Sequence, residues 1–136
     1  MSLTRDKLMA AGVDNFFLKL NAHDLDGVMQ GIAEECEMRI PSSNFTYTGW
    51  QALRDHLQDF VSSFPVINFR DFISVADPVE NRLAVRFNIS LTEDDGTETH
   101  MSNCNFFEVN EDGLLTDILI FASAPLSKGF EVGSST

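Results

Sequence analysis

Asp71 and His56 are the two ionisable side chains best placed to do chemistry in this sequence. A carboxylate buried on an apolar strand face would have a raised pKa, as a general acid/base requires. Asp71, in the segment NFRDFISVA, has the same strand parity as four apolar residues: Ile67, Phe69, Ile73 and Val75. A β-bulge or a strand end here would instead turn Asp71 to solvent. The cost of burying an unpaired carboxylate favours the solvent-facing alternative.

His56 is the second candidate acid/base group. It lies one position before Leu57, close to the apolar face of an expected helix but off its centre. The alternative is a histidine at the boundary of that face with no chemical role. With His23 and His100 it forms no close-spaced metal motif, so we expect no metal. We also expect no cofactor, because no glycine-rich phosphate loop joins a strand to a helix.

Composition and charge exclude several classes of protein. The 136 residues, 43% hydrophobic with 12 Phe, are typical of one globular domain. The net charge of −12 argues against nucleic acid and against anionic membrane surfaces as partners. No apolar run approaches the ~20 residues of a membrane span. Cys36 and Cys104 lie in apolar strand contexts, so we expect buried thiols and a cytoplasmic, reducing setting.

Hydrophobic periodicity predicts helices first and strands afterwards. Apolar residues recur at helical spacing in three stretches: 3–21, 24–33 and 49–64. Asp24 is the expected cap of the second helix. Strands are expected at 34–41, 45–48, 66–77, 82–93, 98–109 and 114–124. Short turns join the last four, so these strands are expected to be antiparallel neighbours. The layout is α+β, with one domain over residues 1–125 and a flexible Ser/Gly-rich tail over 126–136.

Four segments of the chain resemble a known family. They are LNAHDLDGVMQGIAEECEMRIP, TGWQALRDHLQDFVSSFPVINF, NRLAVRFNIS and FFEVNEDGLLTDILIFASA. In order and spacing they are similar to the SnoaL-like polyketide cyclases and ketosteroid isomerases of the nuclear transport factor 2-like superfamily. The resemblance covers about residues 5–124. It implies a cone-shaped, curved and mainly antiparallel sheet wrapped around three N-terminal helices.

The resemblance also implies a pocket for a small hydrophobic molecule inside the cone. The alternative is a plain core with no cavity. Strand periodicity supports the inward face independently at 36–40 and 83–89, but at 103–107 it cannot choose a face. The implied lining is Phe16, Phe17, Met38, Ile40, Trp50, Leu57, Phe60, Phe87, Asn103, Asn105, Phe107, Ile118 and Ile120.

The residues that ketosteroid isomerases use are absent. By the resemblance, Ile40 occupies the position of the carboxylate base, and Phe16 occupies that of one oxyanion donor. Asn105 occupies the other and can still donate through its amide. A hydrocarbon cannot abstract a proton, so that isomerase activity is rejected. Three hypotheses remain: an isomerase or cyclase using Asp71 or His56 with Asn105 as an orienting donor, a non-catalytic ligand-binding module, and a dimerising interaction module.

The final strand predicts a homodimer. The segment LLTDILIFASA is apolar on both parities, and such a strand is buried on both faces. The helices cover one face only, so something else must cover Leu119, Phe121 and, on the neighbouring strand, Phe106. A second copy of the same sheet is the simplest cover. The alternative is that residues 126–132 of the tail fold back over this patch.

Overall fold

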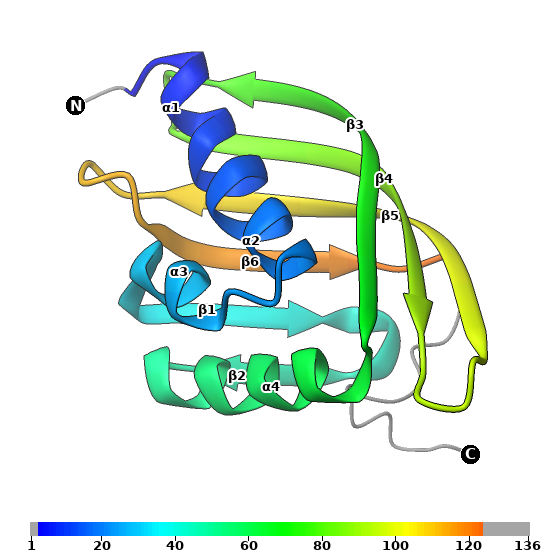
Figure 1. Cartoon of the computed structure of the whole chain (residues 1–136). Helices are drawn as coiled ribbons and strands as arrows, with labels where there is room; N and C mark the ends of the chain where they lie inside the picture. Colours follow the sequence, from blue (N-terminus) through cyan, green and yellow to red (C-terminus); the bar gives the residue numbers. More distant parts are fainter. Residues whose placement is uncertain (1–2, 124–136) are drawn as a thin grey trace.

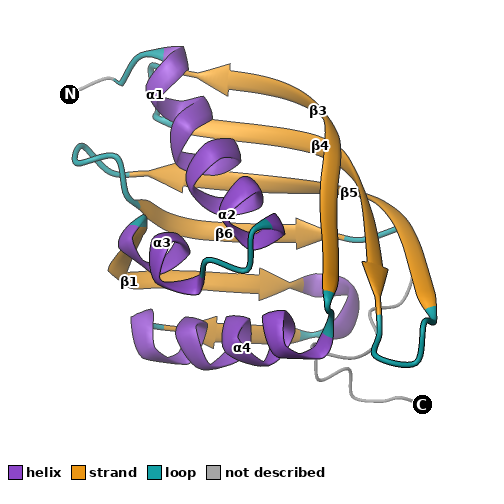
Figure 2. Ribbon diagram, viewed as in Figure 1, coloured by secondary structure: helices purple, strands orange, loops and turns teal. Residues whose placement is uncertain are grey.

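A six-stranded sheet with helices on one of its faces makes up the part of the chain that the computed structural model describes, residues 3–123 (Figures 1 and 2). Three neighbouring strands, β3 (Val66–Asp77), β4 (Arg82–Thr92) and β5 (Glu98–Val109), bend sharply part-way along their length, so the sheet is strongly curved (Figure 1). This is the α+β cone expected from the sequence. The expected tail, 126–136, lies outside the described residues.

The first helical segment is continuous but changes its winding. It comprises α1 (Arg5–Met9), the π-helical η1 (Ala10–Phe17) and α2 (Leu18–Asn21). The spacing of apolar residues had predicted a helix here but not the π-helical turn, a form that is frequent at functional sites. Phe16 and Phe17, which are adjacent in sequence, are both buried at the end of η1.

The remaining helices are α3 (Leu25–Gln30), the short 3-10 turn η2 (Pro41–Ser43) and α4 (Trp50–Ser63). Asp24 caps α3 as predicted, because its Oδ1 accepts a hydrogen bond of 3.0 Å from the backbone N–H of Gly27. The expected helix at 24–33 ends early, at Gln30. Ile32 pairs with Leu115, and the backbone N–H of Leu115 donates to the carbonyl of Gly31 at 2.9 Å. Residues 31–33, which the periodicity assigned to the helix, therefore pair with the sheet instead.

The strands run in the order β2-β1-β6-β5-β4-β3. β1 and β6 are parallel, and every other neighbouring pair is antiparallel, so the sheet is mixed but mainly antiparallel, as predicted. The bounds are β1 (Ile32–Ile40), β2 (Phe45–Thr48), β3 (Val66–Asp77), β4 (Arg82–Thr92), β5 (Glu98–Val109) and β6 (Leu115–Phe121). In the described part of the chain, no helix is long and apolar enough to cross a bilayer.

Asn21, at the end of the first helical segment, is hydrogen-bonded to the backbone of β3. Its Nδ2 donates to the carbonyl of Phe69 at 2.9 Å, and its Oδ1 accepts from the N–H of the same residue at 2.7 Å. The His23 ring lies 2.7 Å from the carbonyl of Phe64, where α4 has ended. These contacts hold the helices over the concave face of the sheet, where the core lies.

The two cysteines differ in their surroundings. Cys36 on β1 is fully buried, and burial, reinforced by the nearby carboxylates of Asp117, Glu35 and Glu37, raises its pKa to about 12. Cys104 on β5 is half-buried.

We predict that the Cys104→Ser variant, in which Cys36 is the remaining thiol, resists modification by iodoacetamide at pH 8 when it is folded. Three pKa units lower the thiolate fraction by roughly a thousandfold, and burial adds a steric barrier. Mass spectrometry should find one label in urea and none in buffer. Comparable labelling rates in the two conditions would show that Cys36 is accessible.

Candidate functional site

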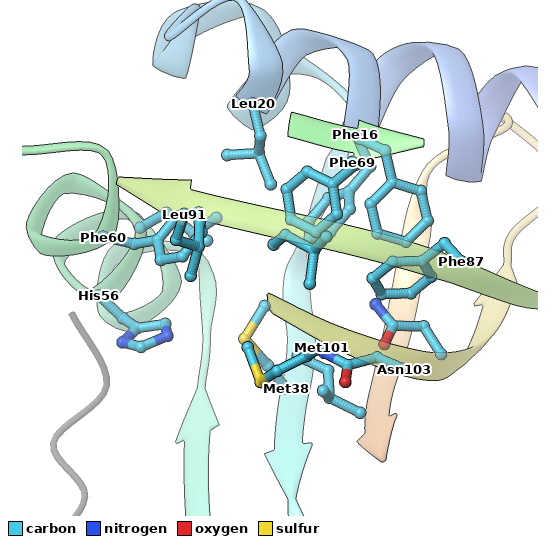
Figure 3. A pocket seen from close by; sticks show the side chains of 15 residues that line it. Phe16, Leu20, Met38, His56, Phe60, Phe69, Phe87, Leu91, Met101 and Asn103 are labelled. Carbon is cyan, nitrogen blue, oxygen red and sulfur yellow. The ribbon is translucent and has the colours of Figure 1, made fainter. Parts of the chain in front are cut away.

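A cavity of about 40 Å³ lies between the concave face of the sheet and the helices that cover it (Figure 3). This volume has room for roughly three water molecules. Strands contribute one wall, and η1, α2 and α4 contribute the other. The lining residues are Phe16, Phe17, Leu20, Met38, His56, Leu57, Phe60, Phe69, Phe87, Ile89, Leu91, Met101, Asn103, Asn105 and Ile120.

Three of the lining side chains are polar, and none carries a charge at pH 7. His56, Asn103 and Asn105 are 5%, 7% and 2% exposed. The Oδ1 of Asn103 accepts a hydrogen bond of 3.1 Å from the backbone N–H of Ser123. The buried Oδ1 of Asn105 has no hydrogen-bond partner among residues 3–123. The inward direction implied for both asparagines by the resemblance is the one that the structure has.

His56 lies on the cavity wall rather than at the boundary of α4. Its ring stacks on that of Tyr47, with centroids 4.1 Å apart and planes at 18°. Burial lowers the pKa of His56 to about 4, although the nearby carboxylate of Asp59 acts in the opposite direction. The imidazole is therefore neutral at pH 7, with one nitrogen that donates and one that accepts.

Asp71 does not reach the cavity, so the alternative of a β-bulge is correct. The register between β3 and β4 shifts between Arg70 and Ile73, and Asp71 at this shift has a left-handed backbone with φ 59°. Its side chain is 63% exposed and accepts a hydrogen bond of 2.9 Å from Nδ2 of Asn88. The bulge breaks the strand parity: Phe69 before it is buried, whereas Ile73 after it is exposed.

The other predicted pocket residues divide into two groups. Those that line the cavity are Phe16, Phe17, Met38, Leu57, Phe60, Phe87, Asn103, Asn105 and Ile120. Ile40, Phe107 and Ile118 are buried in the core outside the cavity lining. Trp50 is half-buried and donates its indole N–H to the carbonyl of Met29 at 3.1 Å.

Ile89, in the stretch 83–89 that was predicted to face inward, also lines the cavity, and four cavity residues were missing from the prediction: Leu20, Phe69, Leu91 and Met101. A signal for two of them exists in the sequence. Leu91 continues the inward parity of Phe87 along β4, and Met101 continues that of Asn103 along β5. The alternation extends further along both strands than the predicted pocket did.

Comparison with known proteins assigns the family. The SnoaL-like domain family matches residues 13–118, most of the chain. The chain belongs to this family. Its fold is accordingly that of the SnoaL-like branch of the nuclear transport factor 2-like superfamily, as the sequence resemblance implied. No curated protein matches the chain.

Several solved structures share the fold of this SnoaL-like protein. AusH from Aspergillus nidulans is 18% identical, with a TM-score of 0.77 over 93% of this chain and 90% of the other. BvnE pinacolase from Penicillium brevicompactum is 19% identical, with a TM-score of 0.76 over 90% and 88%. The epoxide hydrolase/cyclase-like enzyme SalBIII, which acts in pyran ring formation in salinomycin, is 18% identical, with a TM-score of 0.74 over 87% and 92%. At these identities the likeness concerns the fold.

Proposed function

We propose that this protein binds a small hydrophobic molecule in the cavity between the helices and the sheet. The observation that carries the proposal is the lining itself, which is apolar except for His56, Asn103 and Asn105. Small-molecule sites combine such an apolar wall with a few polar groups that fix orientation. The fold supports this use, since BvnE and SalBIII are named as enzymes of small-molecule chemistry.

We further propose that His56 is the base of an isomerisation or cyclisation, with Asn105 as an orienting donor. His56 is the one ionisable side chain in the lining, and at pH 7 it is in the form that can accept a proton. Its low pKa makes it a weak base in these apolar surroundings. A negative charge developing on a bound ligand would raise that pKa and assist the transfer. Ile40, at the position of the isomerase base, is a buried hydrocarbon outside the lining.

Binding can be tested with methyl-labelled methionine and a panel of small neutral cyclic alcohols and ketones. Met38 and Met101 line the cavity, whereas Met29 is buried elsewhere, on α3. A ligand in the cavity should shift the NMR signals of the Met38 and Met101 methyl groups and leave that of Met29 in place. Shifts at Met29 alone, or none at all, would contradict the proposed site.

Catalysis can be tested by deuterium exchange at the carbon next to the carbonyl of a bound ketone. The protein-catalysed exchange rate is the measured rate minus the rate in buffer alone. In the His56→Gln variant this rate should be about a hundredfold lower than in the wild type, because removing a general base typically has an effect of this size. The matched control is His100→Gln, because the His100 side chain is 61% exposed. Binding without exchange would favour the alternative of a non-catalytic binding module.

We also propose a homodimer through the outer face of the sheet. Phe106 and Phe121 are 46% and 43% exposed there, with ring centroids 6.0 Å apart, and Leu119 is paired with Phe106 in the sheet register. A shallow groove of about 430 Å³ on this face has both positive and negative side chains, including Arg82 and Glu108. Mixed charges around an apolar centre suit a self-complementary two-fold contact.

We predict that the double variant Leu119→Glu, Phe121→Glu is monomeric. Burying two carboxylates in an apolar interface is strongly unfavourable. The matched control is Val79→Glu, an exposed apolar residue outside this patch. Sedimentation of the full chain at micromolar concentration should give dimers for the wild type and the control. A monomeric wild type would contradict the dimer, and would agree with the alternative in which the tail, which lies outside the described residues, covers the patch.

A cytoplasmic setting is proposed as well. Cys36 and Cys104 are both free thiols. Unpaired cysteines are typical of reducing compartments.

A further inference from the structure

The chemical class of the ligand follows from what surrounds the cavity. None of the lining residues is Asp, Glu, Lys or Arg. An ion entering this space would lose its hydration without meeting an opposite charge, which costs far more than burying a neutral group. The same surroundings already disfavour the charged form of His56. The cavity therefore favours an uncharged molecule.

Asn105 adds a requirement for one polar group. Its two partners across the sheet are Val85 on β4 and Ile120 on β6, both apolar. The neighbouring Asn103 has its Oδ1 engaged by Ser123, whereas the Oδ1 of Asn105 has no partner among the described residues. Buried amides in folded proteins are nearly always hydrogen-bonded to protein, water or ligand.

A hydroxyl matches Asn105 better than a carbonyl or an ether does. The unpartnered oxygen requires a donor, and a ketone or an ether has none. A hydroxyl can also accept, so it fits the asparagine amide in either orientation of its terminal group. The neutral imidazole of His56 also lines the cavity, so the wall has a further uncharged polar group.

The size of the ligand is limited by side chains that can move. The cavity of about 40 Å³ is smaller than ordinary ligand sites. Met38 and Met101 lie against it, and the sulfur atoms of the cavity come from them (Figure 3). Methionine is unbranched and flexible, so these two side chains can be displaced at low cost.

We propose that the ligand of this cavity is a small uncharged alcohol whose hydroxyl is hydrogen-bonded by Asn105. This inference rests on the proposed binding function and narrows it to one chemical class. The hydroxyl donates to the Oδ1 of Asn105, and the hydrocarbon part of the ligand lies against the aromatic and methionine side chains.

Three probes of similar size separate the possibilities: cyclopentanol, methylcyclopentane and cyclopentanecarboxylate. Each is titrated at pH 7, with the methyl signals of Met38 and Met101 as the readout. Cyclopentanol should bind at least about tenfold more tightly than methylcyclopentane, because leaving the buried amide unpaired costs roughly that factor. The carboxylate should give no saturable shift. This comparison uses the wild-type protein, so it does not depend on a variant that folds.

The Asn105→Leu variant tests the residue directly. Leucine has nearly the shape of asparagine without its polar atoms, so the preference for cyclopentanol over methylcyclopentane should disappear. Asn68→Leu is the matched control, since Asn68 is exposed on β3, and it should keep the preference.

The outcomes distinguish failure of the alcohol preference from failure of the proposed binding function. Equal binding of the alcohol and the hydrocarbon, or an unchanged preference in Asn105→Leu, overturns the inference and leaves the binding function intact. Stronger binding of the carboxylate does the same. The variant Met101→Ala enlarges the cavity. If no probe binds to the wild type or to Met101→Ala, the binding function is wrong and the inference falls with it.

Discussion

Replacing Phe17 by alanine is expected to lower the free energy of unfolding by about 3–5 kcal/mol, the range found for large aromatic residues in cores. Phe17 is fully buried. Its ring lies 4.5–5.7 Å, between centroids, from those of Phe16, Phe69, Phe72, Phe87 and Phe107. These rings come from the first helical segment and from three strands, so truncation leaves a void that no single element can close. Urea unfolding at a fixed protein concentration measures the loss.

Leu18→Ala is the control for this measurement. Leu18 is the next residue in the chain and is 44% exposed, so its truncation removes far less buried area. Its effect should stay within about 0.5 kcal/mol, as at most surface positions. A loss below about 1 kcal/mol for Phe17→Ala, or equal losses for the two variants, would show that the aromatic cluster does not hold the helix on the sheet.

Much of the fold was accessible from the sequence because its elements are long and regular. β3, expected at 66–77, has those bounds in the structure, and β5, expected at 98–109, agrees equally well. α4 keeps its apolar spacing over its whole length and stops before Pro65. In these elements the local spacing of apolar residues was enough to predict the secondary structure, because tertiary contacts did not change it.

The errors occur where pairing outweighs the local pattern. Ile32 has helical spacing with Val28 and Met29, but its backbone joins β1 beside β6. Asp71 would face the cavity only in an unbroken strand, and the favoured alternative, a β-bulge that turns it to solvent, is the correct one. A bulge leaves no certain mark in the composition, although aspartate tolerates the left-handed backbone found there better than most residues.

The candidate site was predictable in its polar residues and unpredictable in its volume. Asn105 faces inward as the family resemblance implied, while periodicity alone left both faces of that strand open. His56 was recognisable as a candidate, but its burial depends on the Tyr47 ring from β2, far from the helix pattern. The cavity is the space left by side chains from helices and strands distant in sequence, so no local pattern encodes it.

Acidification should destabilise the wild-type protein more than the His56→Gln variant, by about 3 kcal/mol between pH 7.5 and pH 4. The pKa of His56 is about 4 in the folded protein and near 6.5 in an unfolded chain. Below pH 6.5 the unfolded chain binds a proton at this residue and the folded protein does not, so acid favours unfolding. The effect is absent above pH 6.5, grows as the pH falls, and levels off near pH 4, where the folded protein also binds the proton. Glutamine at this position removes the titration.

The measurement is the difference in unfolding free energy between the two proteins, followed by urea titration at each pH. Taking the difference cancels the contribution of the 21 Asp and Glu residues, which titrate in the same range. His100→Gln, at an exposed site, should run nearly parallel to the wild type. If the His56→Gln curve also runs parallel, the imidazole is not held neutral inside the protein. The environment inferred for the cavity would then be wrong, and with it the assignment of His56 as a neutral base.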